Sequence, residues 1–286
     1  MKKQKKNMSP FRETIYRFCR NRISLIGLVI VFIIIFVIIF GEQISPYEVG
    51  VQQNIANRLQ GPSVDHWFGT DGYGRDIFTR VIHGTKYTML IAVPAVVLAQ
   101  ALGVLLGALA AFYSRLDDIL MRILDVFQAI PGTLMALAIV AALGTSLPNL
   151  VIAMFISRVP GSARSSRAVM LSLVDQDHIV AARSYGSRDY HLIFGHIIPN
   201  ALGPIIVDFT INLSAITLQV SSLSYIGLGV QPPTPEWGVL LSEAREFMQV
   251  APHTIIFPGL AILIAALAFN LVGDGLRDAL DPKLRD

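Results

Sequence analysis

The chain has 286 residues, 53% of them hydrophobic and only 15% charged. Because a soluble domain carries about 25% charged residues, this composition argues against a soluble enzyme and indicates a membrane protein. The net charge of +3 does not indicate nucleic-acid binding, since the basic residues form no single face or stripe. The one cysteine, Cys19, excludes an internal disulfide framework.

The N-terminal part predicts a basic cytoplasmic tail followed by one span. Residues 1–22 contain eight lysines and arginines, and an uncharged apolar segment follows. This segment predicts the first transmembrane helix over 23–41. Its isoleucines and valines would favour a strand in water, but an isolated strand cannot satisfy its backbone in lipid, so a helix is expected. The segment is too long for a secretory signal, and no small-residue cleavage pattern follows it.

The rest of the chain predicts five more spans. After an extracytoplasmic loop over 42–86, a membrane core is expected over 87–274 and a cytoplasmic tail over 275–286. The apolar segments of the core lie at about 87–113, 119–143, 149–158 or beyond, 197–227 and 254–273. The fourth is the weakest, because Arg158, Pro160 and Gly161 interrupt it. The expected fold class is therefore all-α and integral to the membrane, with six transmembrane helices.

The distribution of basic residues predicts the orientation. The segments expected on the side of the termini hold 18 of the 23 lysines and arginines, and the opposite side holds 5. The positive-inside rule therefore places both termini in the cytoplasm. On the other side, Trp67 and Trp237 are candidates for a headgroup boundary, and residues 237–248 are compatible with a short re-entrant or surface helix.

The second span carries small residues at every fourth position, which places them on one helical face. These are Ala95, Ala99, Gly103, Gly107 and Ala111. Small side chains let another helix backbone approach closely. The neighbour is either another helix of this chain or a second, similar subunit, and the sequence leaves both readings open.

The fifth span carries a polar stripe made of Asp208, Asn212 and Gln219. An aspartate at a helix centre costs roughly 2.5–3.5 kcal/mol on insertion scales, so it should face protein or water. One reading is that the stripe lines a hydrated substrate path. The other is that it makes hydrogen bonds between helices without touching cargo.

The loop over 174–196 is a polar segment between apolar spans. Asp177 is a candidate N-cap, Gly186 suits a left-handed C-cap, and Ser187 or Asp189 can cap a second helix. A short helix is not stable alone and must dock, either on its own bundle or on a partner. Small side chains at Ala181 and Ala182 would let it sit deep in a groove, which favours the partner.

This loop resembles the "EAA" loop of ABC importer permeases. Ala181, Ala182, Gly186 and Pro199 match the pattern, whereas Val180 stands where the family usually has glutamate. Three longer segments, 66–77, 227–238 and 269–282, resemble the dipeptide/oligopeptide/nickel branch, and the N-terminal span and outer loop resemble its second ("C-type") permease.

The resemblance implies a type I ABC importer permease in a bacterial or archaeal cell membrane, surrounded by lipid. It implies a second homologous permease, two ABC ATPase subunits and an extracytoplasmic solute-binding protein as partners. Asp177, Ala181, Ala182, Gly186 and Pro199 would then couple the chain to the ATPases. The cargo would be peptides or a related small solute, such as a nickel chelate, an opine or a glutathione-like thiol.

Other functional classes find little support in the sequence. There is no Gly-x-x-x-x-Gly-Lys-Ser/Thr loop, no histidine pattern for a metal and no nucleophile elbow. We therefore expect no cofactor, no metal, no nucleic-acid partner and no catalytic residue, with ATP hydrolysis on partner subunits. The main alternative is an ion-coupled secondary transporter with Asp208 as the ion site, but it predicts internal repeats, and none is visible.

Overall fold

The structure is a computed structural model that describes residues 10–280. Predictions for the outermost parts of the two tails, 1–9 and 281–286, lie outside the described residues. All regular elements in the described part are helical, apart from an isolated bridge between Thr70 and Asp76. The α-helices are α1 (Pro10–Arg20), α2 (Arg22–Ile44), α3 (Tyr47–Val51), α4 (Ile77–Phe112), α5 (Ser114–Gln128), α6 (Gly132–Leu143), α7 (Leu147–Val174), α8 (Asp177–Ser184), α9 (Asp189–Leu192), α10 (Ile198–Tyr225), α11 (Trp237–Ala244) and α12 (His253–Leu280).

Four helical runs in the described residues are long and apolar enough to cross a membrane, and a fifth crossing is possible. The four are α2, α4, the continuous run from Asp189 to Tyr225, and α12. The possible fifth is the pair α5 and α6, which is bent by 78°. The segment expected as the third span, 119–143, is therefore broken between the two helices, because Pro131 stands there and cannot continue α5.

The fourth expected span is the helix α7, which does not pass the same test of length and composition. It nevertheless runs without interruption through Arg158, Pro160 and Gly161. Two of its arginines are neutralised from α5, where Asp125 pairs with Arg164 and Asp117 pairs with Arg167.

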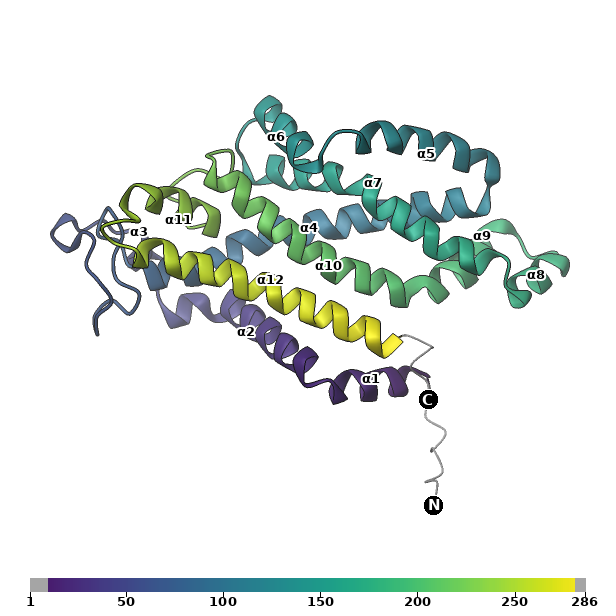
Figure 1. Cartoon of the computed structure of the whole chain (residues 1–286), viewed down its shortest axis with the longest axis horizontal. Helices are drawn as coiled ribbons and strands as arrows, with labels where there is room; N and C mark the ends of the chain where they lie inside the picture. Colours follow the sequence, from purple (N-terminus) through teal and green to yellow (C-terminus); the bar gives the residue numbers. More distant parts are fainter. Residues whose placement is uncertain (1–9, 281–286) are drawn as a thin grey trace, which may run out of the picture.

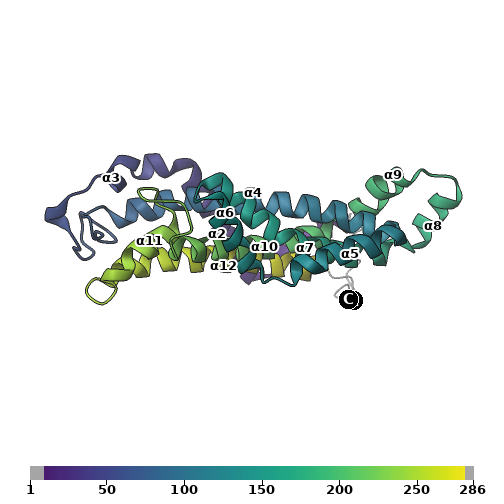
Figure 2. The ribbon, with the colours of Figure 1, turned by 90° about the horizontal axis from the view of Figure 1, so that it is seen from above.

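The long helices lie along the long axis of the molecule, and two groups of connecting segments lie at its ends, whereas α6 and the breaks on either side of it lie between them (Figure 1). One end holds α3, α11 and the segment 52–76, and we call it the α11 end. The opposite end holds α8 and α9, and we call it the α8 end (Figures 1 and 2). Helix α1 and the last turns of α12 also lie toward the α8 end, and α1 packs against α12.

The small-residue stripe of α4 packs against α7 of the same chain. Ala99 is 1% exposed. A Cβ added to Gly103 would lie 2.6 Å from the Cβ of Ser162, and one added to Gly107 would lie 2.7 Å from the backbone nitrogen of Arg167. Only a residue without a side chain allows the two backbones to come this close. The neighbour of this stripe is therefore a helix of this chain and not a second subunit.

Candidate functional site

Helix α8 begins one residue earlier than a cap at Asp177 requires. Gln176 is the extended residue before the helix and makes no side-chain cap, and Asp177 is the first helical residue. The N-cap prediction was therefore wrong. At this position the carboxylate still favours the helix, because the free amides of the first turn carry partial positive charge.

The end of α8 has the geometry expected for Gly186. Its φ is +82°, in the left-handed region. Its N–H donates to the carbonyl of Arg183 at 3.0 Å, and the N–H of Ser187 donates to the carbonyl of Ala182 at 3.1 Å. This pair of bonds is the Schellman motif, which satisfies two carbonyls that the helix end would leave unpaired.

The contacts that hold α8 and α9 on the bundle are few. Ile179 is 1% exposed and packs in a cluster with Met170 of α7 and with residues at the start of the α10 run. The guanidinium of Arg183 lies 4.7 Å from the ring centre of Phe112. The hydroxyl of Tyr113 donates to Asp189 at 2.9 Å, and this hydrogen bond raises the pKa of Tyr113.

Neither Ser187 nor Asp189 caps the second helix. Arg188 is the extended residue before α9 and makes no side-chain cap, and Asp189 is already inside the helix. The carboxylate of Asp189 instead accepts the hydrogen bond of Tyr113. Pro199 is the second residue of α10 and follows the π-helical segment Ile193–Ile197, so it lies inside the continuous helical run and leaves the carbonyl four residues earlier without its N–H.

The other face of α8 is open. Asp177, Val180 and Ala181 are exposed, Ala182 is half-buried, and Tyr185 after the helix is 90% exposed. Helix α8, which was expected to dock on a partner, therefore buries one residue, Ile179, against its own bundle and leaves most of its remaining surface exposed.

The polar stripe of α10 divides into two sites. Asp208 accepts hydrogen bonds from the hydroxyl of Ser165 at 3.2 Å and from the side-chain amide of Asn212 at 3.0 Å. Gln219 lies elsewhere, since its amide donates to the carbonyl of Gly132 in α6 at 3.3 Å. Asp208 and Asn212 thus act together, and Gln219 joins two helices.

Two further polar residues beside Asp208 were not predicted. Arg158 of α7 interacts electrostatically with Asp208 without forming a direct ion pair, and its Nε is buried and unpartnered. Gln100 of α4 is 5% exposed and close enough to interact with Asp208, yet both atoms of its amide lack a hydrogen bond of normal geometry. A polar side chain inside an apolar segment was the available signal for both.

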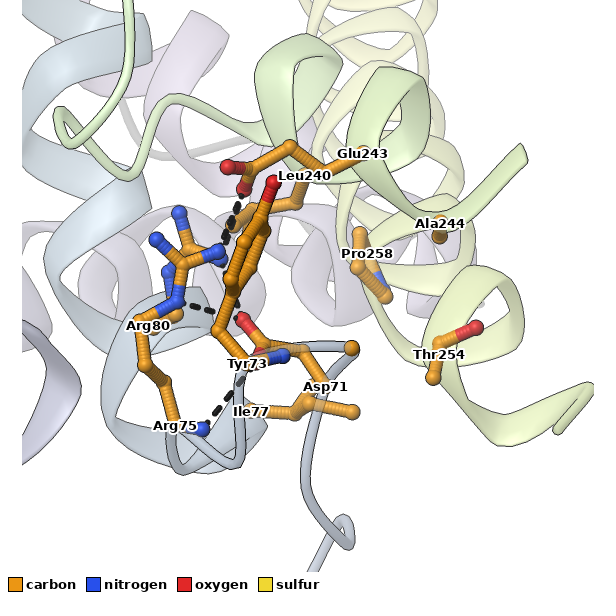
Figure 3. Close-up of a pocket in the computed structure, with 11 residues that line it drawn as sticks. Asp71, Tyr73, Arg75, Ile77, Arg80, Leu240, Glu243, Ala244, Thr254 and Pro258 are labelled. Carbon is orange, nitrogen blue, oxygen red and sulfur yellow. Dashed lines mark hydrogen bonds and ion pairs between the residues drawn. The ribbon is translucent and has the colours of Figure 1, made fainter. Parts of the chain in front are cut away.

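A network of four charged residues lies at the α11 end (Figure 3). Asp71 accepts from Arg75 Nε and from Arg80 Nη1, both at 2.7 Å. Glu243 of α11 accepts a hydrogen bond from Arg75 at 2.9 Å and forms an ion pair with Arg80 at 2.7 Å. Burial works against the charge of Arg75, but the two carboxylates outweigh it and raise the pKa of Arg75. The sequence reasoning missed this network.

A second buried carboxylate, Glu236, fixes the start of α11. Its side chain is fully buried, and burial raises its pKa. It accepts hydrogen bonds from the backbone of Gly238 and Val239 and from the hydroxyl of Thr88 in α4. The next residue, Trp237, is 2% exposed and donates to a backbone carbonyl of α4, so its predicted place at the headgroups was wrong. The short helix expected after it is α11.

Comparison with known proteins places these features in one family. Residues 103–286 match the binding-protein-dependent transport system inner membrane component family, and residues 9–62 match the N-terminal transmembrane domain of oligopeptide transport permease C.

Two relatives span nearly the whole chain. The dipeptide transport system permease protein DppC of Alkalihalophilus pseudofirmus is 43% identical over 97% of this chain and 91% of its own length. The glutathione transport system permease protein GsiD of Escherichia coli is 45% identical over 97% and 92%.

A solved structure supports the fold. It shows the MetNI methionine ABC transporter in inward-facing conformations, and the matching chain has a TM-score of 0.59 at 15% identity. The match covers 71% of this chain and 97% of the other. Together with the family matches and the two relatives, it shows that the chain belongs to the family of inner-membrane components of binding-protein-dependent transport systems and is a C-type permease of this family.

Proposed function

We propose that the chain is one of two permease subunits of an ATP-driven importer for peptides or related small solutes. It would form the translocation path with a second, homologous permease. Two ABC ATPase subunits would hydrolyse ATP, and an extracytoplasmic binding protein would deliver the solute. The names of the dipeptide and glutathione permeases among the relatives support this range of cargo, and nickel chelates and opines stay within it.

The observation that carries the proposal is the construction of α8. This helix has a Schellman end at Gly186 and one buried anchor, Ile179, while its other face is exposed. A surface helix this short is held by packing, not by its own propensity. Such a helix suits a groove in a partner, and we assign that groove to an ATPase subunit.

The same assignment places the α8 end in the cytoplasm of a bacterial or archaeal cell. The basic residues support this orientation, because 18 of 23 lie in segments expected on that side. α1 and the end of α12 also lie toward the α8 end (Figure 1). The α11 end, with its outer loop, would then face the solute-binding protein.

An ion-coupled secondary transporter is the weaker alternative. The feature in its favour is Asp208 with its polar neighbours Ser165, Asn212, Gln100 and Arg158, which we call the Asp208 cluster. A carboxylate in a span is a common proton or cation site. The family matches do not favour it. In that case the chain alone would concentrate solute in vesicles, and the proposal predicts that it does not.

The substitution Gly186→Leu tests the role of α8. Leucine is strained at a φ of +82°, so the end of α8 should be displaced. Gly186→Asn is the matched control, because asparagine adopts the left-handed conformation more readily than other residues with side chains. The complete complex is reconstituted in vesicles, and ATP hydrolysis and solute uptake are measured together.

We expect Gly186→Leu to lose most of its uptake per ATP hydrolysed and Gly186→Asn to keep most of it. Assembly of both variants with the ATPases is checked by co-purification. If Gly186→Leu assembles and transports with the ratio of the unaltered protein, α8 does not transmit the motion.

A further inference from the structure

The Asp208 cluster borders a hollow between three helices. The hollow has a volume of about 480 Å³ and lies between α7, α10 and α12. This size falls within the roughly 300–1,000 Å³ of small-molecule sites. Two charged residues of opposite sign line it, Asp208 on α10 and Arg277 on α12, and the walls between them are mainly apolar, with Val169, Val207, Ile211 and Leu280.

Asp208 keeps acceptor capacity for a ligand. One of its oxygens accepts from Ser165 and the other from Asn212. A carboxylate offers about four lone-pair sites, so the two hydrogen bonds and the neighbouring amide of Gln100 leave at least one of them for a ligand. A charge in the interior of a membrane protein is costly unless it is paired or hydrogen-bonded; Asp208 has these hydrogen bonds and the nearby cation Arg158, with which it forms no direct ion pair.

Arg277 is available on the other wall. It is exposed and forms no ion pair within residues 10–280. Helices α10 and α12 approach closely near Gly203, where an added Cβ would lie 3.2 Å from the side chain of Leu280. From this contact, Asp208 lies five residues farther from the α8 end on α10, and Arg277 lies three residues farther from that end on α12. At 1.5 Å per residue, Asp208 therefore lies roughly one turn or less deeper in the bundle than Arg277.

The polar side chains behind Asp208 provide an independent indication of a ligand. The amide of Gln100 is almost wholly buried beside Asp208, and neither its donor nor its acceptor makes a hydrogen bond of normal geometry. An unsatisfied buried polar group costs about 1–3 kcal/mol. With Nε of Arg158 also unpartnered, the cluster can receive further polar groups.

We propose that this hollow binds the main-chain charges of a small zwitterionic peptide. The ammonium group lies against Asp208, the carboxylate lies against Arg277, and the apolar walls accept side chains with little discrimination. This inference rests on the proposed importer function and adds a cargo class and a binding mode to it. It also gives Arg277 a role in specificity that the sequence did not predict.

A zwitterionic lipid headgroup carries similar charges, but the observations favour a peptide. Asp208 is the eleventh residue of α10, which places it roughly 15 Å along the helix from Ile198. A headgroup ammonium would have to enter this far between helices, whereas a peptide crossing the membrane must pass this depth.

The test measures equilibrium binding to the assembled permease–ATPase complex in detergent without the solute-binding protein, so that only the membrane part selects. The probe is radiolabelled alanylalanine. N-acetylalanylalanine lacks the ammonium group and alanylalaninamide lacks the carboxylate, and both serve as competitors. The variants are Asp208→Asn and Arg277→Gln. Asp278→Asn is the control, since Asp278 is exposed on the same helix and does not line the hollow.

In the unaltered complex we expect either modification of the peptide to weaken binding about tenfold or more, because hydrogen bonds between charged groups are lost. Asp208→Asn should weaken the binding of alanylalanine and abolish its preference over N-acetylalanylalanine. The preference over alanylalaninamide should stay. Arg277→Gln should show the reverse pattern, and Asp278→Asn should match the unaltered complex. Because Arg277 is exposed, its variant is expected to fold even if Asp208→Asn does not.

Three results would overturn the inference. The unaltered complex binds none of the probes or binds all three alike, or both variants weaken all three equally, or phosphatidylethanolamine displaces alanylalanine and shows the same dependence on the two residues. ATP-driven uptake by the unaltered complex with its binding protein is measured separately. If uptake occurs and the binding pattern is absent, this inference fails and the importer function stands.

Discussion

The substitution Glu243→Gln should release α11 from the outer loop. Glu243 forms ion pairs with Arg75 and Arg80, whose side chains are 3% and 2% exposed. Glutamine keeps the shape and one acceptor oxygen but removes the charge. Among the residues that the structure describes, Asp71 is then the one anion paired with two guanidinium groups, and one positive charge is buried without compensation.

The expected cost follows from this arrangement. Removing one partner of a buried ion pair costs about 3–5 kcal/mol. Glu243 is 16% exposed and its replacement still accepts a hydrogen bond, so we expect the lower end, about 3 kcal/mol. At 1.4 kcal/mol per tenfold change, local opening becomes about 100-fold more frequent.

Hydrogen exchange of the purified protein in detergent measures this opening directly. The amides of α11 (Trp237–Ala244) should exchange about 100-fold faster, while those of α4 beyond its first turns should change little. Glu246→Gln is the matched control, because Glu246 is exposed nearby and forms no ion pair in the part of the chain that the structure describes. If α11 in Glu243→Gln exchanges as in the control, the network does not hold the helix.

Two other substitutions test the packing of the bundle. Gly103→Ala should destabilise the purified protein by about 1–3 kcal/mol in thermal unfolding, because its Cβ would meet the backbone of α7, whereas Gly161→Ala, which meets no heavy atom within 4 Å, should be neutral or slightly stabilising. Glu236→Gln should lower the stability of α11 by about 1–3 kcal/mol, because one amide oxygen cannot replace the two carboxylate oxygens that accept from Gly238, Val239 and Thr88 of α4. Unaltered protection of the α11 amides in hydrogen exchange would contradict this prediction.

The apolar segments of the sequence located most of the long helices, because the thickness of the bilayer sets their length. The first span was expected over 23–41, and α2 covers Arg22–Ile44. The second was expected from residue 87, but α4 begins at Ile77. Hydropathy marks where charges end, whereas the helix begins where Asp76 accepts the N–H of Thr79 at 2.8 Å. The cap, not the apolar segment, sets this boundary.

The sequence could not predict which polar residues meet. Asp125 pairs with Arg164 of α7 and Asp117 with Arg167, at sequence separations of 39 and 50 residues. Hydropathy counts each of these charges as a cost, in addition to the interruption at Arg158, Pro160 and Gly161 that made the fourth span look weak. The pairing across α5 and α7 offsets that cost, and it is visible only once the two helices are placed side by side.

The candidate site was predictable to a similar extent. Gly186 was found because a left-handed helix end has a residue signature, and Asp208 because a carboxylate in a span is rare. Arg277 was counted only as a basic residue of the tail, and Gln100 was not noticed. The roles of both residues depend on contacts among α4, α7, α10 and α12, and no local sequence pattern in one segment predicts those contacts.

The strengths of the contacts around α8 indicate where a force on this helix would go. The hydrogen bond from Tyr113 to Asp189 ties α9 to the end of α4 and is worth about 0.5–1.5 kcal/mol, or somewhat more because one partner is charged. Burial of Ile179 against Met170 and Ile193 is worth about 1.5–3 kcal/mol.

The chain itself also joins α8 to α7 on one side and, through α9, to α10 on the other. If a partner pushes on α8, the bond to α4 therefore yields first, and α7 and α10 move with α8. These two helices carry Ser165 and Asp208, two of the polar residues that line the hollow. A push at the α8 end would thus act directly on the walls of the proposed cargo site, without passing through the network at the α11 end.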